Sequence, residues 1–326
     1  MLRSGILLTL LAVSITGCSE PGVVQPDRPF ASDGSTEVLK PQQNGSIVFT
    51  RERSDGGCDL FTIEPDGTSA RPLTHTASTC ETGVAVAPGG SMVATSLDLN
   101  DIALIDLATS ALRPLTDDAN VLDGSPAWSP DASQIAFDRG PPLGPSHLYV
   151  MDADGSDLRQ LTRGGAWDRN AAWSPDGKRI AFARSGNAGF EVYVMDADGS
   201  NVTAVTSVAA ESAPSPSWSP DGSRIALDVN GAIHVVSADG TDLRRLSPEL
   251  PKGVLDMDPS WSPDGTRIAF MRYTNDDVAD TPVADTPEDG DIWIVNIDGA
   301  VAIRVTRGAA IDGWPEWVSG SVLHGR

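Results

Sequence analysis

A carboxylate recurs five residues before a repeating Trp-Ser-Pro-Asp motif, and this series holds the residues best suited to chemistry. Five of the six equivalent positions are acidic and the other is Ala213; the acids are Glu81, Asp123, Asp168, Asp256 and Asp312. A ring of carboxylates could concentrate cations or basic groups, or supply the several oxygen ligands that Ca²⁺ requires. The local alternative is that each side chain caps a turn by accepting a hydrogen bond from its own backbone.

The motif itself recurs at a nearly constant period, which predicts a fold of repeated units. It begins at Trp128, Trp173, Trp218 and Trp261, at intervals of 45, 45 and 43 residues. Residues 179–182, 191–195 and 202–206 of one copy are rich in β-branched and aromatic residues, and Asp-Gly pairs typical of hairpin turns precede the first and the last of them. Four short antiparallel strands in about 40 to 45 residues are typical of one blade of a β-propeller. We expect the tryptophans to pack in the core or between blades.

Degenerate copies at both ends of the repeat region predict how the ring closes. Residues 86–90 and 314–318 are degenerate forms of the motif, and the first unit, from residue 46, has three expected strands but no inner strand. No complete unit follows the last copy. We therefore expect the strand at 314–318 to fill the empty inner position of the first blade, which gives six blades and leaves no open sheet edge between the first and last blades.

The repeat resembles the β-propeller repeat of TolB-type proteins. The resemblance rests on Trp-Ser-Pro-Asp-Gly, the following Ile-Ala-Phe strand and Tyr-Val-Met-Asp-Ala-Asp-Gly, and it covers residues from about 45 to 317. It implies an all-β, six-bladed propeller of four-stranded antiparallel blades. The separate N-terminal domain of TolB has no expected counterpart here, and propellers serve unrelated functions, so the resemblance implies the fold more strongly than the role.

The first 18 residues resemble a bacterial lipoprotein signal peptide. Arg3 precedes a short apolar run, residues 6–13, which is too short to span a bilayer as a mature helix. Small residues then precede Cys18, and the resemblance implies that Cys18 is lipidated and becomes the first residue of the mature chain. The alternative is an ordinary signal with an incidental cysteine. Ser19 in place of Asp implies the outer membrane in a cell with two membranes.

Composition divides the rest of the chain. Residues 19–43 contain four prolines and no periodic apolar face, so we expect a disordered tether. The propeller is expected at 44–320 and a short tail at 321–326. An exported, lipid-anchored protein of this kind would lie on the periplasmic or cell-surface side of the envelope.

Two cysteines remain if Cys18 is lipidated. Cys58 and Cys80 lie in loops that the repeat places on the same face, and an exported protein reaches a compartment that permits disulfides. We predict a Cys58–Cys80 disulfide that clamps the first blade beside the ring closure. Two free thiols are the alternative.

One face of the predicted propeller carries the loops that vary in length, and such loops often hold function. The acidic series should lie near the channel mouth on this face with Trp167 and Trp314, and together they form a candidate rim for a partner or a cation. The two indoles could stack on a sugar or peptide; packing beneath a loop is the alternative. The longest loop, 273–291, is strongly acidic and is interpreted as a mobile flap or as a solvated insertion.

The charge balance excludes one class of partner. The chain has 45 acidic and 23 basic residues and a net charge of −22, whereas nucleic-acid binding requires a basic surface. The same charge opposes direct binding to anionic lipids, so we expect membrane contact through the lipid anchor only.

We therefore predict a monomeric cell-envelope lipoprotein. Its propeller would be a non-catalytic binding scaffold for a protein or peptide partner, and the acidic loop face would steer a basic one. One alternative is a Ca²⁺-dependent hydrolase of the lactonase type, a class found among propellers related to TolB, with carboxylates at the channel mouth. Another is a purely structural component of the envelope. The four histidines lack the spacing of a zinc site, no Gly-x-Ser-x-Gly is present, and no cofactor is expected apart from Ca²⁺ at the channel mouth.

Overall fold

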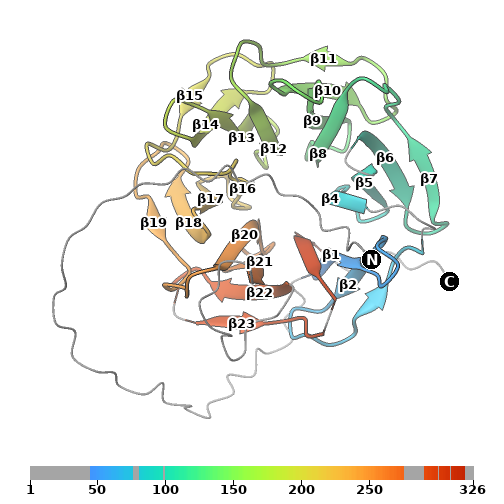
Figure 1. Cartoon of the computed structure of the whole chain (residues 1–326), viewed down its shortest axis with the longest axis vertical. Coiled ribbons are helices and arrows are strands. Elements are labelled where there is room, and N and C mark those ends of the chain that lie inside the picture. The colour runs from blue at the N-terminus through green and yellow to red at the C-terminus, as the bar shows by residue number, and fades with distance from the viewer. Residues whose placement is uncertain are drawn as a thin grey trace. The chain divides into compact units, whose positions relative to one another are not determined.

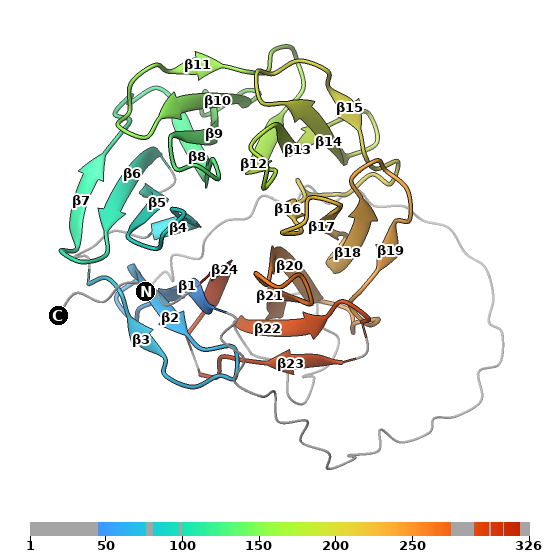
Figure 2. The ribbon, with the colours of Figure 1, turned by 180° about the vertical axis from the view of Figure 1, so that it is seen from behind.

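Six four-stranded sheets surround a central axis. The computed structural model describes residues 45–319 except 76–80, 98–99, 275–289, 300 and 309. Within this part of the chain, twenty-four β-strands form the six sheets. The sheets are arranged as blades, with the first strand of each blade innermost and the fourth outermost (Figures 1 and 2). This arrangement confirms the predicted all-β, six-bladed propeller.

Each blade is an antiparallel sheet that runs from the axis outward. Blade 1 contains, from the axis outward, β24 (Asp312–Val318), β1 (Ser46–Glu52), β2 (Cys58–Ile63) and β3 (Arg71–Pro72). Blade 2 contains β4 (Glu81–Val86), β5 (Met92–Leu97), β6 (Asp101–Asp106) and β7 (Ala111–Pro114). Blade 3 contains β8 (Leu122–Trp128), β9 (Gln134–Gly140), β10 (His147–Asp152) and β11 (Arg159–Gln160). Blade 4 contains β12 (Asp168–Trp173), β13 (Arg179–Ser185), β14 (Phe190–Asp196) and β15 (Thr203–Ala204). Blade 5 contains β16 (Ser217–Trp218), β17 (Arg224–Val229), β18 (Ala232–Ser237) and β19 (Arg244–Arg245). Blade 6 contains β20 (Val254–Trp261), β21 (Arg267–Thr274), β22 (Asp291–Asn296) and β23 (Ala302–Arg304). The outermost strands have only two to four residues, and short edge strands limit pairing with other chains.

Blade 1 joins the two ends of the repeat region. Strand β24 pairs antiparallel with β1, with Ser46 opposite Val318 and Arg51 opposite Asp312. The C-terminal strand therefore supplies the inner strand of the first blade, and the predicted ring closure is confirmed. A ring closed in this way leaves no open edge between the first and last blades.

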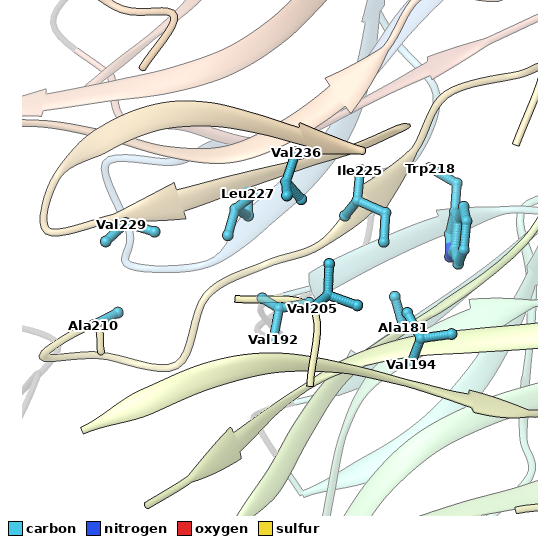
Figure 3. Close-up of a cluster of buried hydrophobic side chains, with 10 residues drawn as sticks. All are labelled: Ala181, Val192, Val194, Val205, Ala210, Trp218, Ile225, Leu227, Val229 and Val236. Carbon is cyan, nitrogen blue, oxygen red and sulfur yellow. The ribbon is translucent and has the colours of Figure 1, made fainter. Parts of the chain in front are cut away.

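Apolar side chains between neighbouring blades form the core. Figure 3 shows one cluster, in which Val192 and Val194 of β14 pack with Ile225 and Leu227 of β17 between blades 4 and 5. Five equivalent clusters lie at the other interfaces of the described residues. Both faces of a blade are covered by neighbours, which explains why the middle strands have consecutive buried residues such as 180–182.

The tryptophans of the motif join neighbouring blades. The indole N–H groups of Trp128, Trp218 and Trp261 donate to backbone oxygens of the preceding blade, each at 3.1 Å. The guanidinium groups of Arg179 and Arg224, also from the preceding blade, lie over Trp218 and Trp261 at 4.7 and 4.9 Å from the ring centroids. Apolar burial, a hydrogen bond and a cation–π contact therefore fix the angle between blades.

Several sequence predictions concern residues outside this description. They include the signal peptide at 1–18, the tether at 19–43, the tail at 321–326, Cys80 and most of the loop 273–291. Within the described residues, no helix is long and apolar enough to cross a membrane.

Candidate functional site

The inner strands depart from regular pairing three residues before the tryptophan of the repeated motif, or before its equivalent in the degenerate copies. The register between the first and second strands shifts there in five blades, as it does at a β-bulge. The bulge residues have left-handed backbone angles, with φ between 47° and 61°; they are Gly83, Ser125, Asn170, Asp258 and Trp314. Left-handed geometry is ordinary for Gly and tolerated by Asn and Asp, but for a bulky residue it is an outlier, and such outliers cluster at functional sites.

These residues line a cavity on the propeller axis. Its volume is about 160 Å³, and its wall is formed by the inner strands of five blades and, in blade 5, by residues just before β16. The six blades contribute one bulge-position residue each: Gly83, Ser125, Asn170, Ser215, Asp258 and Trp314. Blades 6, 1 and 2 are consecutive, so an acid, an indole and a position without a side chain follow one another around the wall. The cavity is therefore chemically asymmetric, which is what a selective binding site requires.

A chain of hydrogen bonds orders the polar part of this wall. The Ser125 hydroxyl donates to Asn170 Oδ1 at 3.0 Å, and Asn170 Nδ2 donates to the backbone oxygens of residues 213 and 214 at 3.2 and 3.1 Å. The Ser215 hydroxyl donates to Asp258 Oδ1 at 2.8 Å, and the Ser215 backbone N–H donates to Asp228 Oδ1 at 2.7 Å. Side chains from blades 3 to 6 are thus held in fixed positions around the axis.

The carboxyl groups around the cavity have raised pKa values. Burial, followed by the charge of Asp258, raises the pKa of Asp228 to about 7. Burial also raises the pKa of Asp258 and of Asp138, and it raises the pKa of Glu316 to about 8. Of these acids Asp258 lines the cavity, and burial therefore makes its negative charge harder to form than in water.

The predicted acidic series lies in a different environment, because its members are paired inside their own blades. The side chains of Asp123, Asp168, Asp256 and Asp312 are at most 2% exposed. Arg184 binds Asp168 with two contacts of 2.6 and 2.9 Å, and Arg272 binds Asp256 with the same two distances. Arg51 binds Asp312 with two contacts of 2.6 Å. The pair in blade 3 is looser, with Arg139 Nε 3.3 Å from Asp123 Oδ1.

This pairing limits what the series can do chemically. A carboxylate that accepts two hydrogen bonds from one guanidinium has its charge neutralised and its orientation fixed, so it is poorly placed to bind Ca²⁺. Among the described residues, no three His, Cys, Asp or Glu side chains are arranged to hold a metal ion. The geometry therefore favours a structural role for Asp168, Asp256 and Asp312. Asp123 differs, because neither of its buried carboxylate oxygens has a hydrogen-bond partner. The side chain of Glu81 lies outside the description.

The arginine partners of these aspartates are a feature that our sequence analysis missed. Each lies directly opposite its aspartate in the antiparallel register, sixteen residues later in blades 3, 4 and 6. Blade 5 has Ala213 and Val229 at these positions, so the acid and the base are absent together. In blade 2 the register places Leu97 opposite Glu81. The acid and the arginine are therefore present together in four blades and absent together in one, and this pattern is the signal that could have identified the pairs.

Trp167 and Trp314 occupy different settings. Trp314 lines the axial cavity. Trp167 is partly buried, its backbone N–H donates to the Ser185 hydroxyl at 2.8 Å, and the guanidinium of Arg169 lies 4.6 Å from its ring centroid. One face of the Trp167 ring is therefore covered, which favours packing for this residue and leaves Trp314 as the aromatic group available to a ligand.

Cys58 begins β2 and is 4% exposed. Its predicted partner Cys80 lies outside the described residues, so the pairing of the two stays a prediction.

Known proteins resemble this chain in sequence pattern and in fold. TolB from Acinetobacter baumannii matches with a TM-score of 0.68 and 19% identity over 85% of this chain and 67% of that one. A putative TolB from Agrobacterium tumefaciens matches with a TM-score of 0.62 and 20% identity over 80% and 88%. An oligogalacturonate lyase in complex with manganese matches with a TM-score of 0.55 and 17% identity over 81% and 75%. These likenesses show the fold. The sequence model described as the TolB beta propeller domain matches residues 100–281, which is more than half of the chain, and the protein therefore belongs to the TolB β-propeller family.

Proposed function

We propose that this protein is an exported, lipid-anchored binding scaffold that holds a protein or peptide partner at the loop end of its propeller. The loop end is the face that carries the loops of variable length, such as the one between β9 and β10. The observation that carries the proposal is the axial cavity, whose wall contains an acid, an indole and an open position in consecutive blades. The backbone angle of Trp314, with φ of 47°, holds an aromatic side chain in this wall at a conformational cost. A rigid ring with a strained aromatic group in its channel suits recognition by preformed contacts.

Charge supports a basic partner. The net charge of −22 would attract cationic surfaces over several ångströms and raise their rate of encounter. Lipidation at Cys18 would hold the scaffold at a membrane and raise its local concentration near envelope partners. The family membership supports an envelope setting, because the structures of similar fold include proteins named TolB.

The hydrolase alternative receives less support from the residues. The similarity to a manganese-containing lyase keeps an enzyme in view, but a metal-dependent mechanism would need several carboxylates around one ion. Three of the four described acids of the series bind arginines through both carboxylate oxygens instead. We therefore place binding before catalysis.

Photo-crosslinking in the native cell tests the proposal. A photoreactive phenylalanine analogue would replace Leu143, which is 98% exposed in the loop between β9 and β10. The matched control is Val202, which is 36% exposed beside the β14–β15 turn at the opposite end of the next blade. We expect the full chain to give a discrete cross-linked species from position 143 and none from position 202. Equal products from both positions, or a product from 202 alone, would contradict binding at the loop end.

A further inference from the structure

The outermost strand of blade 2 differs from the other five outermost strands. Strand β7 has four residues, whereas the others have two or three. All four residues of β7 are exposed, and the strand lies on the outer side of the ring (Figure 1). An exposed edge strand presents unpaired backbone groups to any chain that can pair with it. Strand β7 is therefore the longest open edge in the part of the ring that the structure describes.

One residue of β7 has both of its backbone groups on the open side. The N–H of Leu115, just after β7, donates inward to the oxygen of Ile102 at 2.8 Å, and Leu112 lies opposite Ile105. Inward and outward residues alternate along an antiparallel ladder, so Leu112 directs its N–H and C=O away from β6. Pro114 is also outward, and it offers an oxygen but no N–H. An added strand can thus form up to three hydrogen bonds with β7.

A groove lies beside β7, between blades 2 and 3. Its volume is about 310 Å³, near the lower end of the range for ligand pockets. Leu115, Met151 and Leu158 form its apolar wall, and Leu158 is 46% exposed. The guanidinium of Arg113 in β7 donates to two backbone oxygens of the β10–β11 turn, both at 3.1 Å. This contact fixes the two sides of the groove relative to each other, so the groove is preformed.

One end of the groove is negatively charged. Asp117 and Asp118 are exposed there, and Arg139 is the only basic residue among the described residues that line the groove. Arg139 lies 3.4 Å from Asp118 Oδ2 and 3.3 Å from Asp123 Oδ1. One guanidinium thus faces two carboxylates, and Asp117 adds a third at this end. A basic side chain of a ligand would be attracted here and an acidic one repelled.

We propose that an extended segment of a partner protein pairs with β7 as a fifth strand of blade 2, with an aliphatic side chain in the groove and a lysine or arginine beside Asp117 and Asp118. Backbone hydrogen bonds at a sheet edge supply affinity in this mode of recognition, and side-chain pockets next to the edge supply specificity. The surface lies on the outer side of the ring and does not include the axial cavity. It therefore goes beyond the proposed binding at the loop end and does not depend on it.

Selection from a phage-displayed library of random heptapeptides against the full chain tests the proposal. We expect the enriched peptides to combine aliphatic residues with lysine or arginine, and the best of them, made synthetically, to slow hydrogen exchange of the Leu112 amide in NMR. Leu112→Pro removes the outward N–H and leaves the inward ladder intact, so the affinity should fall at least about tenfold. Val202→Pro is the matched control, because Val205 of blade 4 also donates inward and position 202 is outward in the same way. It should leave the affinity unchanged.

A charge variant keeps the test decisive if the proline variant folds poorly. Asp117→Asn should weaken binding of the basic peptide about threefold, whereas Asp242→Asn, at an exposed position of blade 5, should not. Peptides that bind Leu112→Pro and Asp117→Asn as tightly as the wild type, or a library that yields no binder, would overturn the proposal.

The free chain supplies a further check. The Leu112 amide should exchange rapidly when no peptide is present. Protection that disappears on dilution would assign the edge to a second copy of the chain, and protection that persists would assign it to another segment of the same chain; either result would overturn the proposal. Cross-linking from position 143 reports on a different surface, so failure here leaves the test of the proposed function intact.

Discussion

Replacing Arg272 with methionine is expected to lower the free energy of unfolding by about 3 to 5 kcal/mol, because it leaves a buried carboxylate without its counter-charge. The Asp256 side chain is 0% exposed and receives two hydrogen bonds from Arg272. Methionine keeps much of the contact with Trp293, over whose ring Arg272 lies at 4.4 Å, so the loss reports the charge. Urea denaturation at pH 8 measures it.

Two variants separate the charge effect from packing. Arg139→Met should cost less than Arg272→Met, because the Asp123–Arg139 pair is already longer, at 3.3 Å against 2.6 Å. Removing both charges, with Arg272→Met and Asp256→Leu together, should recover most of the loss, since a buried pair can often be replaced by apolar groups without large cost. A loss below about 1 kcal/mol for Arg272→Met would mean that the pair behaves like an exposed one and contributes little to the blade.

Glu316→Gln is expected to stabilise the protein at pH 9 by about 2 to 4 kcal/mol and to have little effect at pH 5. Burial raises the pKa of Glu316 from 4.5 to about 8, and its Oε2 accepts the backbone N–H of Val86 at 2.5 Å. A folded pKa above the unfolded value means that stability is lost as pH rises from about 4.5 through 8. Glutamine keeps the acceptor and removes the titration. The expected stabilisation is smaller than the full rise in the pKa of Glu316 would give, because the Glu316 side chain is partly exposed.

Urea denaturation at pH 5 and pH 9 tests the prediction for Glu316→Gln. Glu249→Gln is the matched control, because Glu249 is exposed and the variant should follow the wild type at both pH 5 and pH 9. Glu316 lies in β24, and its contact to Val86 joins blade 1 to blade 2, so the gain should appear in the stability of the whole ring. Equal stabilities of Glu316→Gln and wild type at pH 9 would show that Glu316 ionises normally.

The fold was accessible from the sequence because each blade repeats the same physical solution. Trp218 and Trp261 fill the same inter-blade position, and Asp-Gly pairs form the same turns, so their recurrence reports blade number directly. Counting strands in the first and last units was sufficient to predict that β24 completes blade 1, because an unfilled inner position would expose a sheet edge.

The candidate site was harder to predict from the sequence than the fold, for two physical reasons. Asp168 and Arg184 meet only through the antiparallel register, and our reading of the acids as a rim considered one strand at a time. The axial wall is set by bulges whose residues share a backbone conformation and no side-chain type, from Gly83 to Trp314. Left-handed geometry can be anticipated at Gly, Asn or Asp, but a tryptophan gives no such signal.

Titration of Ca²⁺, and then of Mn²⁺, into the full chain by calorimetry tests the central claim that the loop end binds a partner instead of holding a catalytic metal. Asp168→Asn and Asp256→Asn would be measured in parallel. We predict no stoichiometric binding with a micromolar dissociation constant in any of the three proteins, because arginines already occupy the carboxylate oxygens of both residues. Stoichiometric micromolar binding in the wild type that is lost in both variants would contradict the claim and place the metal-dependent hydrolase first.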